Sequence, residues 1–196
     1  MQVGTPVLFC LLLALLCAAP RAEAAAIPGL RRGEAGLEAE LRLDSWEAFF
    51  GNPAPIAFLI LDDEVETPEE HHRRAYDYVI ENQRAILDAM LADLLPAYAV
   101  WKDDWGYADD DMDGLMPAVS APADFAALLR PIAIVVHDAR KDGLPYIGYE
   151  FAATWDEEHG FGAVLHGTRI VDLGGGDTAL LGWIARRDLE GRPIHD

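Results

Sequence analysis

Four short strand-like segments follow one another in the second half of the sequence, and they restrict the fold more than any other feature. Each is rich in β-branched or aromatic residues and is bounded by turn residues, as is typical of β-strands. The segments are Ile132–Val136, Tyr146–Ala152, Phe161–His166 and Arg169–Leu173. Lys141-Asp142-Gly143 and Gly167-Thr168 supply hairpin turns between neighbours, the first with a glycine for a left-handed position. The pattern predicts an antiparallel β-meander in the C-terminal half.

A long amphipathic helix is predicted before the meander. Thr67-Pro68-Glu69-Glu70 indicates its start, with Thr67 as N-cap, Pro68 at the first helical position and Glu70 completing a capping box. One face then repeats at steps of three and four residues through His72, Ala75, Tyr76, Val79, Gln83, Ile86, Leu87, Met90 and Leu94. Because proline interrupts helices, we expect the helix to end at about Leu95, before Pro96.

Shorter elements complete the prediction of an α+β fold. Leucine and alanine at positions 37, 39, 41 and 43 alternate with charged residues, which favours a half-buried strand, although a helix also places Leu37 beside Leu41. Ala54–Leu61 is predicted as a buried strand, and Asp124–Leu129 as a short helix. After Gly174-Gly175-Gly176, Asp177 is expected to cap a short C-terminal helix.

The N-terminal residues have the layout of a secretory signal. Val7–Ala19 is almost purely apolar, and Ala22-Glu23-Ala24 fits a cleavage site. A run of about 13 apolar residues is too short to span a bilayer, which needs about 20. No basic residue precedes the run, so an uncleaved anchor and a misassigned start are alternatives. We expect residues 1–24 to be a signal peptide, 25–36 a linker and 37–196 one α+β domain.

The sequence therefore predicts an exported protein, periplasmic or extracellular, whose mature chain does not insert into a membrane. Both cysteines, Cys10 and Cys17, lie in the predicted signal, which excludes disulfides and thiolate sites from the mature chain. The net charge of −19 repels nucleic-acid backbones and anionic lipids. A basic protein is the partner that this charge favours. The sequence sets no oligomeric state.

The densest polar cluster is Trp155-Asp156-Glu157-Glu158-His159, between two predicted strands. Its three carboxylates and imidazole are of the kinds that bind divalent metals or share protons. Because neighbouring strand residues point to opposite faces, only Asp156 with Glu158, or Glu157 with His159, converge without a turn. The simpler interpretation is a solvated acidic loop whose Trp155 packs into the core. These five residues are the candidate binding residues.

A second acidic segment, containing Asp109, Asp111 and Asp113, matches the first half of an EF-hand calcium loop. The twelfth position should be a glutamate but is Ser120, and Pro117 falls inside the loop. A weak cation site or a plain acidic loop remain the two interpretations. No histidine pair has metalloprotease spacing, and no serine lies in a nucleophile elbow. The sequence therefore assigns no catalytic residue.

Several motifs in the C-terminal half occur together in a known order. They are Tyr146-Ile-Gly-Tyr-Glu-Phe, Trp155-Asp-Glu-Glu-His-Gly, His166-Gly-Thr-Arg-Ile-Val and Gly174-Gly-Gly-Asp-Thr-Ala-Leu-Leu. In this order they resemble the bacterial domain-of-unknown-function family numbered 6985, strongly over about residues 130–190. The resemblance carries over no catalytic residue and no cofactor. It implies a small, acidic accessory protein of immunity-like type.

Two functional hypotheses remain. The first is a non-enzymatic binding or immunity-like accessory protein, exported, that acts through its acidic surface and residues 155–160. The alternative is a metal-dependent hydrolase or metal-binding enzyme in which Asp156, Glu158 and His159 converge with His137 or His166 on a divalent cation. Apart from that cation, no cofactor is predicted. Enzymatic activity is left open, with the absence of a recognisable nucleophile arguing against it.

Overall fold

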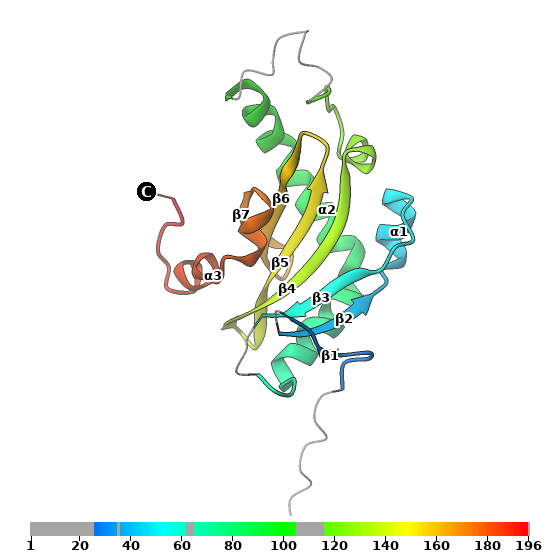
Figure 1. Cartoon of the computed structure of the whole chain (residues 1–196). Coiled ribbons are helices and arrows are strands. Elements are labelled where there is room, and N and C mark those ends of the chain that lie inside the picture. The colour runs from blue at the N-terminus through cyan, green and yellow to red at the C-terminus, as the bar shows by residue number, and fades with distance from the viewer. Residues whose placement is uncertain (1–25, 35, 62–64, 105–115, 196) are drawn as a thin grey trace, which may run out of the picture.

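One seven-stranded sheet forms the centre of the molecule in a computed structural model (Figure 1) that describes residues 26–34, 36–61, 65–104 and 116–195. The strands lie in the order β1-β2-β3-β4-β5-β6-β7. They are β1 (Arg31–Arg32), β2 (Leu37–Leu41), β3 (Ile56–Ile60), β4 (Leu129–Lys141), β5 (Leu144–Ala153), β6 (Asp156–His166) and β7 (Arg169–Gly174). Neighbouring strands are antiparallel except β3 and β4, which are parallel. The predicted α+β class and C-terminal meander are confirmed.

The turns of the meander explain its register. Between β4 and β5, Asp142 and Gly143 both adopt the left-handed conformation, with φ of 53° and 79°. Two consecutive left-handed residues are what a tight two-residue hairpin requires, because its twist then matches that of the strands. Between β6 and β7, Gly167 has a φ of 64°. Both predicted turns are therefore present, and the strands extend further than predicted.

The parallel pair arises because the long helix α2 (Glu70–Asp104) connects β3 to β4. The helix covers one face of the sheet (Figure 1) and buries apolar residues such as Val79, Ile86 and Met90 against the strands. This is the amphipathic face that the sequence predicts. Although α2 has 35 residues, neither it nor another helix in the described ranges is long and apolar enough to cross a membrane.

The predicted end of this helix is wrong, because α2 continues through Pro96 to Asp104. Proline inside a helix removes one hydrogen bond and costs about 3 kcal/mol. Packing beyond the proline offsets this cost. Tyr98 is buried, its ring lies 5.4 Å from that of Phe125 and 5.0 Å from that of Trp155, and its hydroxyl donates to the Pro117 carbonyl at 3.0 Å.

The start of α2 also differs from the prediction, since the helix begins at Glu70 rather than Pro68. The Glu69 carbonyl accepts hydrogen bonds from the amides of His72 and Arg73. In return, Nδ1 of His72 accepts a hydrogen bond from the Glu69 amide at 3.0 Å. Histidine at the third helical position thus makes the bond that glutamate makes in a capping box. The predicted Thr67–Glu70 box is replaced by a Glu69–His72 pair.

The opposite face of the sheet carries a 3-10 helix, η3 (Gly176–Leu180), and the C-terminal helix α3 (Gly182–Leu189). A small apolar cluster joins α3 to the strands through Tyr146, Val164, Ile184 and Ala185. The short C-terminal helix is confirmed, but Asp177 does not cap it. The backbone at Leu181 separates η3 from α3, and the N-cap position of η3 is Gly175, with no side-chain cap.

Three N-terminal and central elements differ from expectation. Helix α1 (Asp44–Phe50) was not predicted; it buries Trp46, which stacks 5.6 Å from Phe151. Within the predicted linker, β1 pairs with β2 and Ile27 is buried. The predicted helix at 124–129 is instead the 3-10 helix η2 (Pro122–Ala127). Proline in its first turn and its short length suit a 3-10 conformation.

Candidate functional site

The candidate residues lie on the β5–β6 hairpin, whose turn is formed by Thr154 and Trp155. Phe151 pairs with Phe161, and Ala153 pairs with Asp156. Residues 157–160 of β6 therefore lie opposite the single residue Ala152 of β5, which makes a bulge in β6. Gly160 completes this bulge with a φ of 71°, and a side chain there would meet the Phe151 carbonyl. A bulge of this kind re-aims side chains away from the regular pleat.

The bulge brings Asp156 and His159 together. Oδ1 of Asp156 accepts a hydrogen bond from the His159 amide at 2.9 Å and lies 3.0 Å from Nδ1 of its ring. Strict strand alternation would separate residues three apart, and it fails here because the bulge acts as a turn. Oδ2, the other oxygen of this carboxylate, has no hydrogen-bond partner among the described residues. The carboxylate is 26% exposed and remains accessible.

Trp155 anchors the hairpin to the core. Its side chain is only 6% exposed, and its ring lies edge-on to Tyr98 at 5.0 Å. Phe125 at 6.2 Å and Phe161 at 6.4 Å complete its surroundings. Burial of an aromatic ring of this size contributes strongly to stability. The expectation that Trp155 packs into the core is confirmed, so it positions the acidic residues beside it.

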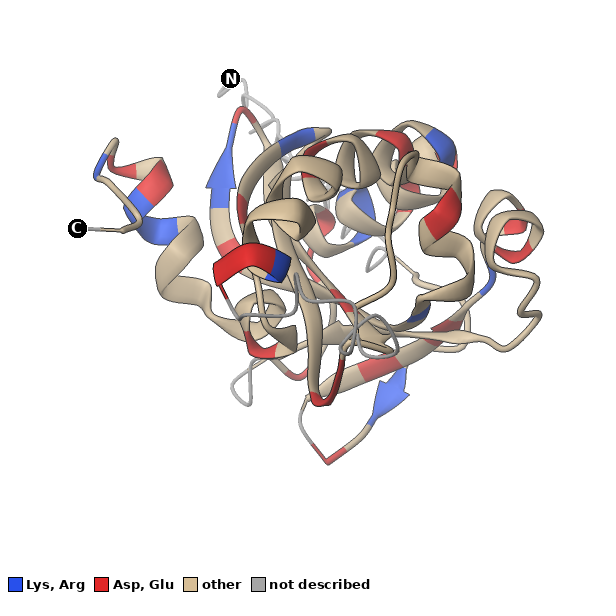
Figure 2. Cartoon of the chain, turned by 90° about the horizontal axis from the view of Figure 1, so that it is seen from above, with Lys and Arg blue, Asp and Glu red and all other residues tan. Residues whose placement is uncertain are grey.

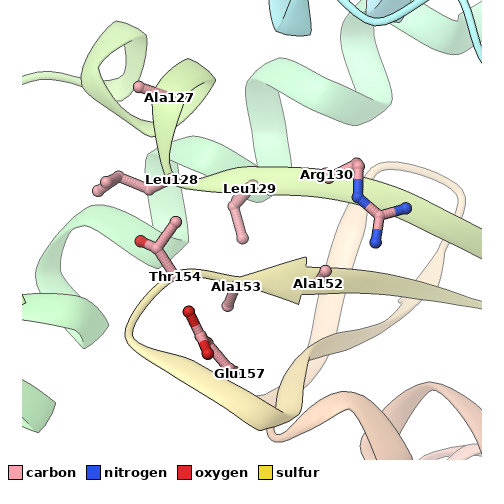
Figure 3. A pocket seen from close by; sticks show the side chains of 8 residues that line it. All are labelled: Ala127, Leu128, Leu129, Arg130, Ala152, Ala153, Thr154 and Glu157. Atoms are coloured by element: carbon pink, nitrogen blue, oxygen red, sulfur yellow. The ribbon is translucent and has the colours of Figure 1, made fainter. Parts of the chain in front are cut away.

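One side of the hairpin borders an open hollow of about 250 Å³, here called the Arg130 hollow (Figure 3). Its lining includes Leu128, Ala152 and Thr154, with Arg130 from β4 and Glu157 from β6 on different sides. Both charged side chains are exposed, and no ion pair joins them within the described part of the chain. This hollow therefore presents one positive and one negative charge.

The other side borders a smaller hollow of about 150 Å³, here called the Trp hollow. It is lined by Trp101, Trp155, Asp156, Leu173 and three glycines at 160, 174 and 175. No basic side chain is among these residues. Oδ1 of exposed Asp177 lies 3.2 Å from where a Cβ on Gly175 would stand, so a second carboxylate adjoins the hollow. Apart from Asp156, the described residues that line the hollow are aromatic, aliphatic or glycine.

The glycine run at 174–176 is explained by close packing against the bulge. A Cβ on Gly176 would lie only 2.4 Å from the His159 carbonyl. Likewise, a Cβ on Gly162 of β6 would lie 2.5 Å from the Gly175 carbonyl. Such distances exclude larger residues unless the backbone moves. The Gly174–Gly176 motif therefore shapes the wall of the Trp hollow.

The metal-site alternative finds no support in the described ranges, which bring together no group of three or more His, Cys, Asp or Glu that could hold a metal ion. His137 is instead buried beside Ala179, and burial lowers its pKa to about 4. Nε2 of His166 lies 3.0 Å from the Lys141 carbonyl. Asp109, Asp111 and Asp113 lie outside the described residues.

A second polar crevice, which sequence reasoning missed, lies where β3 and β4 end beside the start of α2. Two adjoining hollows of about 340 and 100 Å³ share Glu69, His71 and Arg140 in their linings. Nδ1 of His71 lies 3.1 Å from Nη1 of Arg140 and 3.3 Å from Oε2 of Glu69. The rings of His71 and His72 lie 3.8 Å apart.

The surroundings of both histidines in this crevice lower their pKa values. Burial, then the charge of Arg140, lowers the pKa of His71. Burial, then the neighbouring His71, lowers the pKa of His72 to about 4. The sequence places both residues at the start of a helix, but Arg140 follows 69 residues after His71. The parallel pairing of β3 with β4 brings Arg140 beside His71, and no local sequence pattern predicts that pairing.

Comparison with known proteins identifies a family but no characterised relative. No curated protein and no solved structure matches the chain. Residues 37–180 match the family described as a domain of unknown function, DUF6985. The match begins at the first residue of β2 and ends at the last residue of η3, so it contains the β5–β6 hairpin and the glycines that line the Trp hollow. This chain belongs to the DUF6985 family.

Proposed function

We propose that this protein is a non-enzymatic binding protein, exported and immunity-like, that engages a basic protein through the acidic β5–β6 hairpin. The net charge of −19 favours basic partners through long-range attraction. Figure 2 displays Asp and Glu over helices, strands and turns rather than in one place. Overall charge alone therefore selects no docking site.

The observation that carries the proposal is the arrangement of the hairpin. Glu157 and Glu158 are exposed and form no ion pair with another described residue. By contrast, many acidic residues elsewhere pair with arginine, as Asp77 does with Arg73 and Asp88 with Arg84. Unpaired carboxylates on a hairpin anchored by buried Trp155 present charge without first breaking an internal bond. Such preorganisation lowers the cost of binding.

The export component rests on the apolar run Val7–Ala19 and the site Ala22-Glu23-Ala24, whose layout is that of a secretory signal. The acidic surface also supports the absence of nucleic-acid binding, since phosphate backbones would be repelled. The metal-enzyme alternative has no comparable support, because only His159 contacts Asp156, His166 contacts the Lys141 carbonyl instead, and the described residues form no group of three or more potential metal ligands.

The test compares two charge reversals of equal size. Glu157→Lys with Glu158→Lys changes the hairpin, and Glu40→Lys with Glu81→Lys changes exposed acids on β2 and α2. Binding of a blocked oligo-arginine peptide is measured by fluorescence anisotropy over a salt series. We expect wild-type affinity to fall with salt, the hairpin variant to bind at least about tenfold more weakly, and the control to lose about threefold or less. Absence of wild-type binding, or equal losses in both variants, contradicts the proposal.

A further inference from the structure

We infer that the Trp hollow is a binding site for a single guanidinium group, so that the basic partner inserts an arginine side chain beside Asp156. This inference rests on the proposed function and adds to it the chemical group recognised. The Trp hollow and the Arg130 hollow lie on the two sides of the same hairpin. Their linings differ in charge, and that difference selects the ligand.

The lining of the Trp hollow fits a cation. Among the described residues of its lining, Asp156 has the only charged side chain, and Asp177 adjoins the hollow at Gly175. In the Arg130 hollow the negative charge of Glu157 is accompanied by the positive charge of Arg130, which would repel a second cation. Attraction between opposite charges is stronger in a partly enclosed hollow than in open water, because the local dielectric constant is lower. A basic side chain is therefore favoured in the Trp hollow over the Arg130 hollow.

The carboxylate of Asp156 is also oriented for this role. Its two hydrogen bonds to described residues, from the amide and the ring of His159, both involve Oδ1. Oδ2 has no partner in the described part of the chain and can accept from a ligand, while Oδ1 keeps the side chain in one orientation. A cation can bind without displacing His159 and without disturbing the bulge that forms the hollow. Binding to an already oriented carboxylate loses less side-chain entropy.

The walls favour guanidinium over ammonium. Trp101, Trp155 and Leu173 provide apolar surface, and the guanidinium group is more weakly hydrated than an ammonium group, so it enters such surroundings at lower cost. It is also planar, which suits contact with aromatic side chains and with a carboxylate edge. The volume of about 150 Å³ and the three glycines in the lining leave room for one flat group.

The experiment uses three variants of the full chain and two blocked peptides of equal length, oligo-arginine and oligo-lysine. Asp156→Asn removes the carboxylate charge but keeps an oxygen that can accept from the His159 amide. Glu40→Gln is the matched control, because it removes one negative charge from an exposed side chain on β2 that lines neither hollow. Gly175→Ala adds a methyl group to the wall without changing the charge.

Wild type should bind oligo-arginine at least about fivefold more tightly than oligo-lysine, as measured by calorimetry at fixed salt. Asp156→Asn should lose about tenfold and most of that preference, and Gly175→Ala should lose several-fold. Glu40→Gln should lose about threefold or less and keep the preference. Thermal unfolding confirms that each variant is folded.

The experiment distinguishes failure of the proposed function from failure of the guanidinium site alone. If neither peptide binds wild type, the proposed function fails and the guanidinium site fails with it. If the peptides bind but Asp156→Asn and Glu40→Gln lose equal affinity, or if wild type shows no preference for arginine, only the guanidinium site is overturned. In that case the hairpin acts as a diffuse acidic surface.

Discussion

His72 should make the fold sensitive to acid. Its imidazole is 4% exposed, and Nδ1 accepts the Glu69 amide hydrogen at the start of α2. Burial, with the neighbouring His71, lowers its pKa from 6.5 to about 4. An unfolded chain therefore binds a proton at this residue between about pH 6.5 and 4, whereas the folded chain does not. The free energy of unfolding falls as the pH decreases through this range.

The magnitude follows from the two pKa values. Each pKa unit corresponds to 1.36 kcal/mol, so the full effect of His72 is about 3 kcal/mol, and roughly 2.5 kcal/mol is lost by about pH 4.5. His137, whose pKa burial also lowers to about 4, adds a similar loss. Well above pH 6.5, where both residues are neutral in the folded and the unfolded chain, neither contributes a pH dependence. For a chain of marginal stability such losses are large.

The variant His72→Gln tests the effect of protonating His72 separately from the effect of losing its hydrogen bond. Glutamine at the third helical position has an oxygen that can accept the Glu69 amide hydrogen, but it does not titrate. The free energy of unfolding is measured by urea denaturation, with tryptophan fluorescence, at about pH 7 and about pH 4.5. We expect the variant to lose less stability on acidification than wild type, by roughly 2.5 kcal/mol.

His195→Gln is the control, since it removes a histidine whose side chain is 76% exposed rather than buried. Its stability should depend on pH as that of wild type does. If His72→Gln shows the same loss between the two pH values as wild type, the account of His72 as a buried, neutral, capping histidine is wrong.

Three other predictions concern packing and processing. Tyr149→Phe should raise the free energy of unfolding by about 1 kcal/mol in urea denaturation, because the buried Tyr149 hydroxyl has no hydrogen-bond partner among the described residues; a loss would show that the hydroxyl is paired. Gly148→Ala should lower the thermal midpoint and cost about 1–3 kcal/mol or more, because its Cβ would lie 1.9 Å from the Ala179 carbonyl; unchanged stability would contradict this packing of η3. Mass spectrometry of the protein exported from its host should find a chain beginning after Ala24, and an intact N-terminus would refute cleavage.

Local patterns in the sequence were enough to predict the meander, the long helix and the short C-terminal helix. The left-handed turn at Asp142-Gly143 and the apolar face of α2 both act over a few residues, so their signals are visible without the fold. The end of α2 was mispredicted because Tyr98 packs against Phe125 and Trp155. These contacts depend on chain segments that follow much later.

The sequence shows that charged residues cluster beside Trp155, but not how their side chains are arranged. The cluster of charge beside Trp155 indicates a surface feature, and the structure places all five residues on one hairpin. The contact between Asp156 and His159 depends on a bulge, which in turn depends on Gly160 and on the fit of Gly176 against His159. Sequence spacing contains no information on such a fit. The Arg140–His71 contact was missed for the same reason.

The most direct test of the central claim is an NMR titration of the nitrogen-labelled protein with blocked oligo-arginine. We expect the changes in chemical shift to concentrate at the amides of residues 156–160 and 173–175 and at the indole signals of Trp101 and Trp155. The indole of Trp46, which donates to the Gln83 carbonyl in the core, should not move. Shifts spread over acidic residues such as Glu40 and Glu81, with none at the hairpin, would contradict the claim that the β5–β6 hairpin is the binding site.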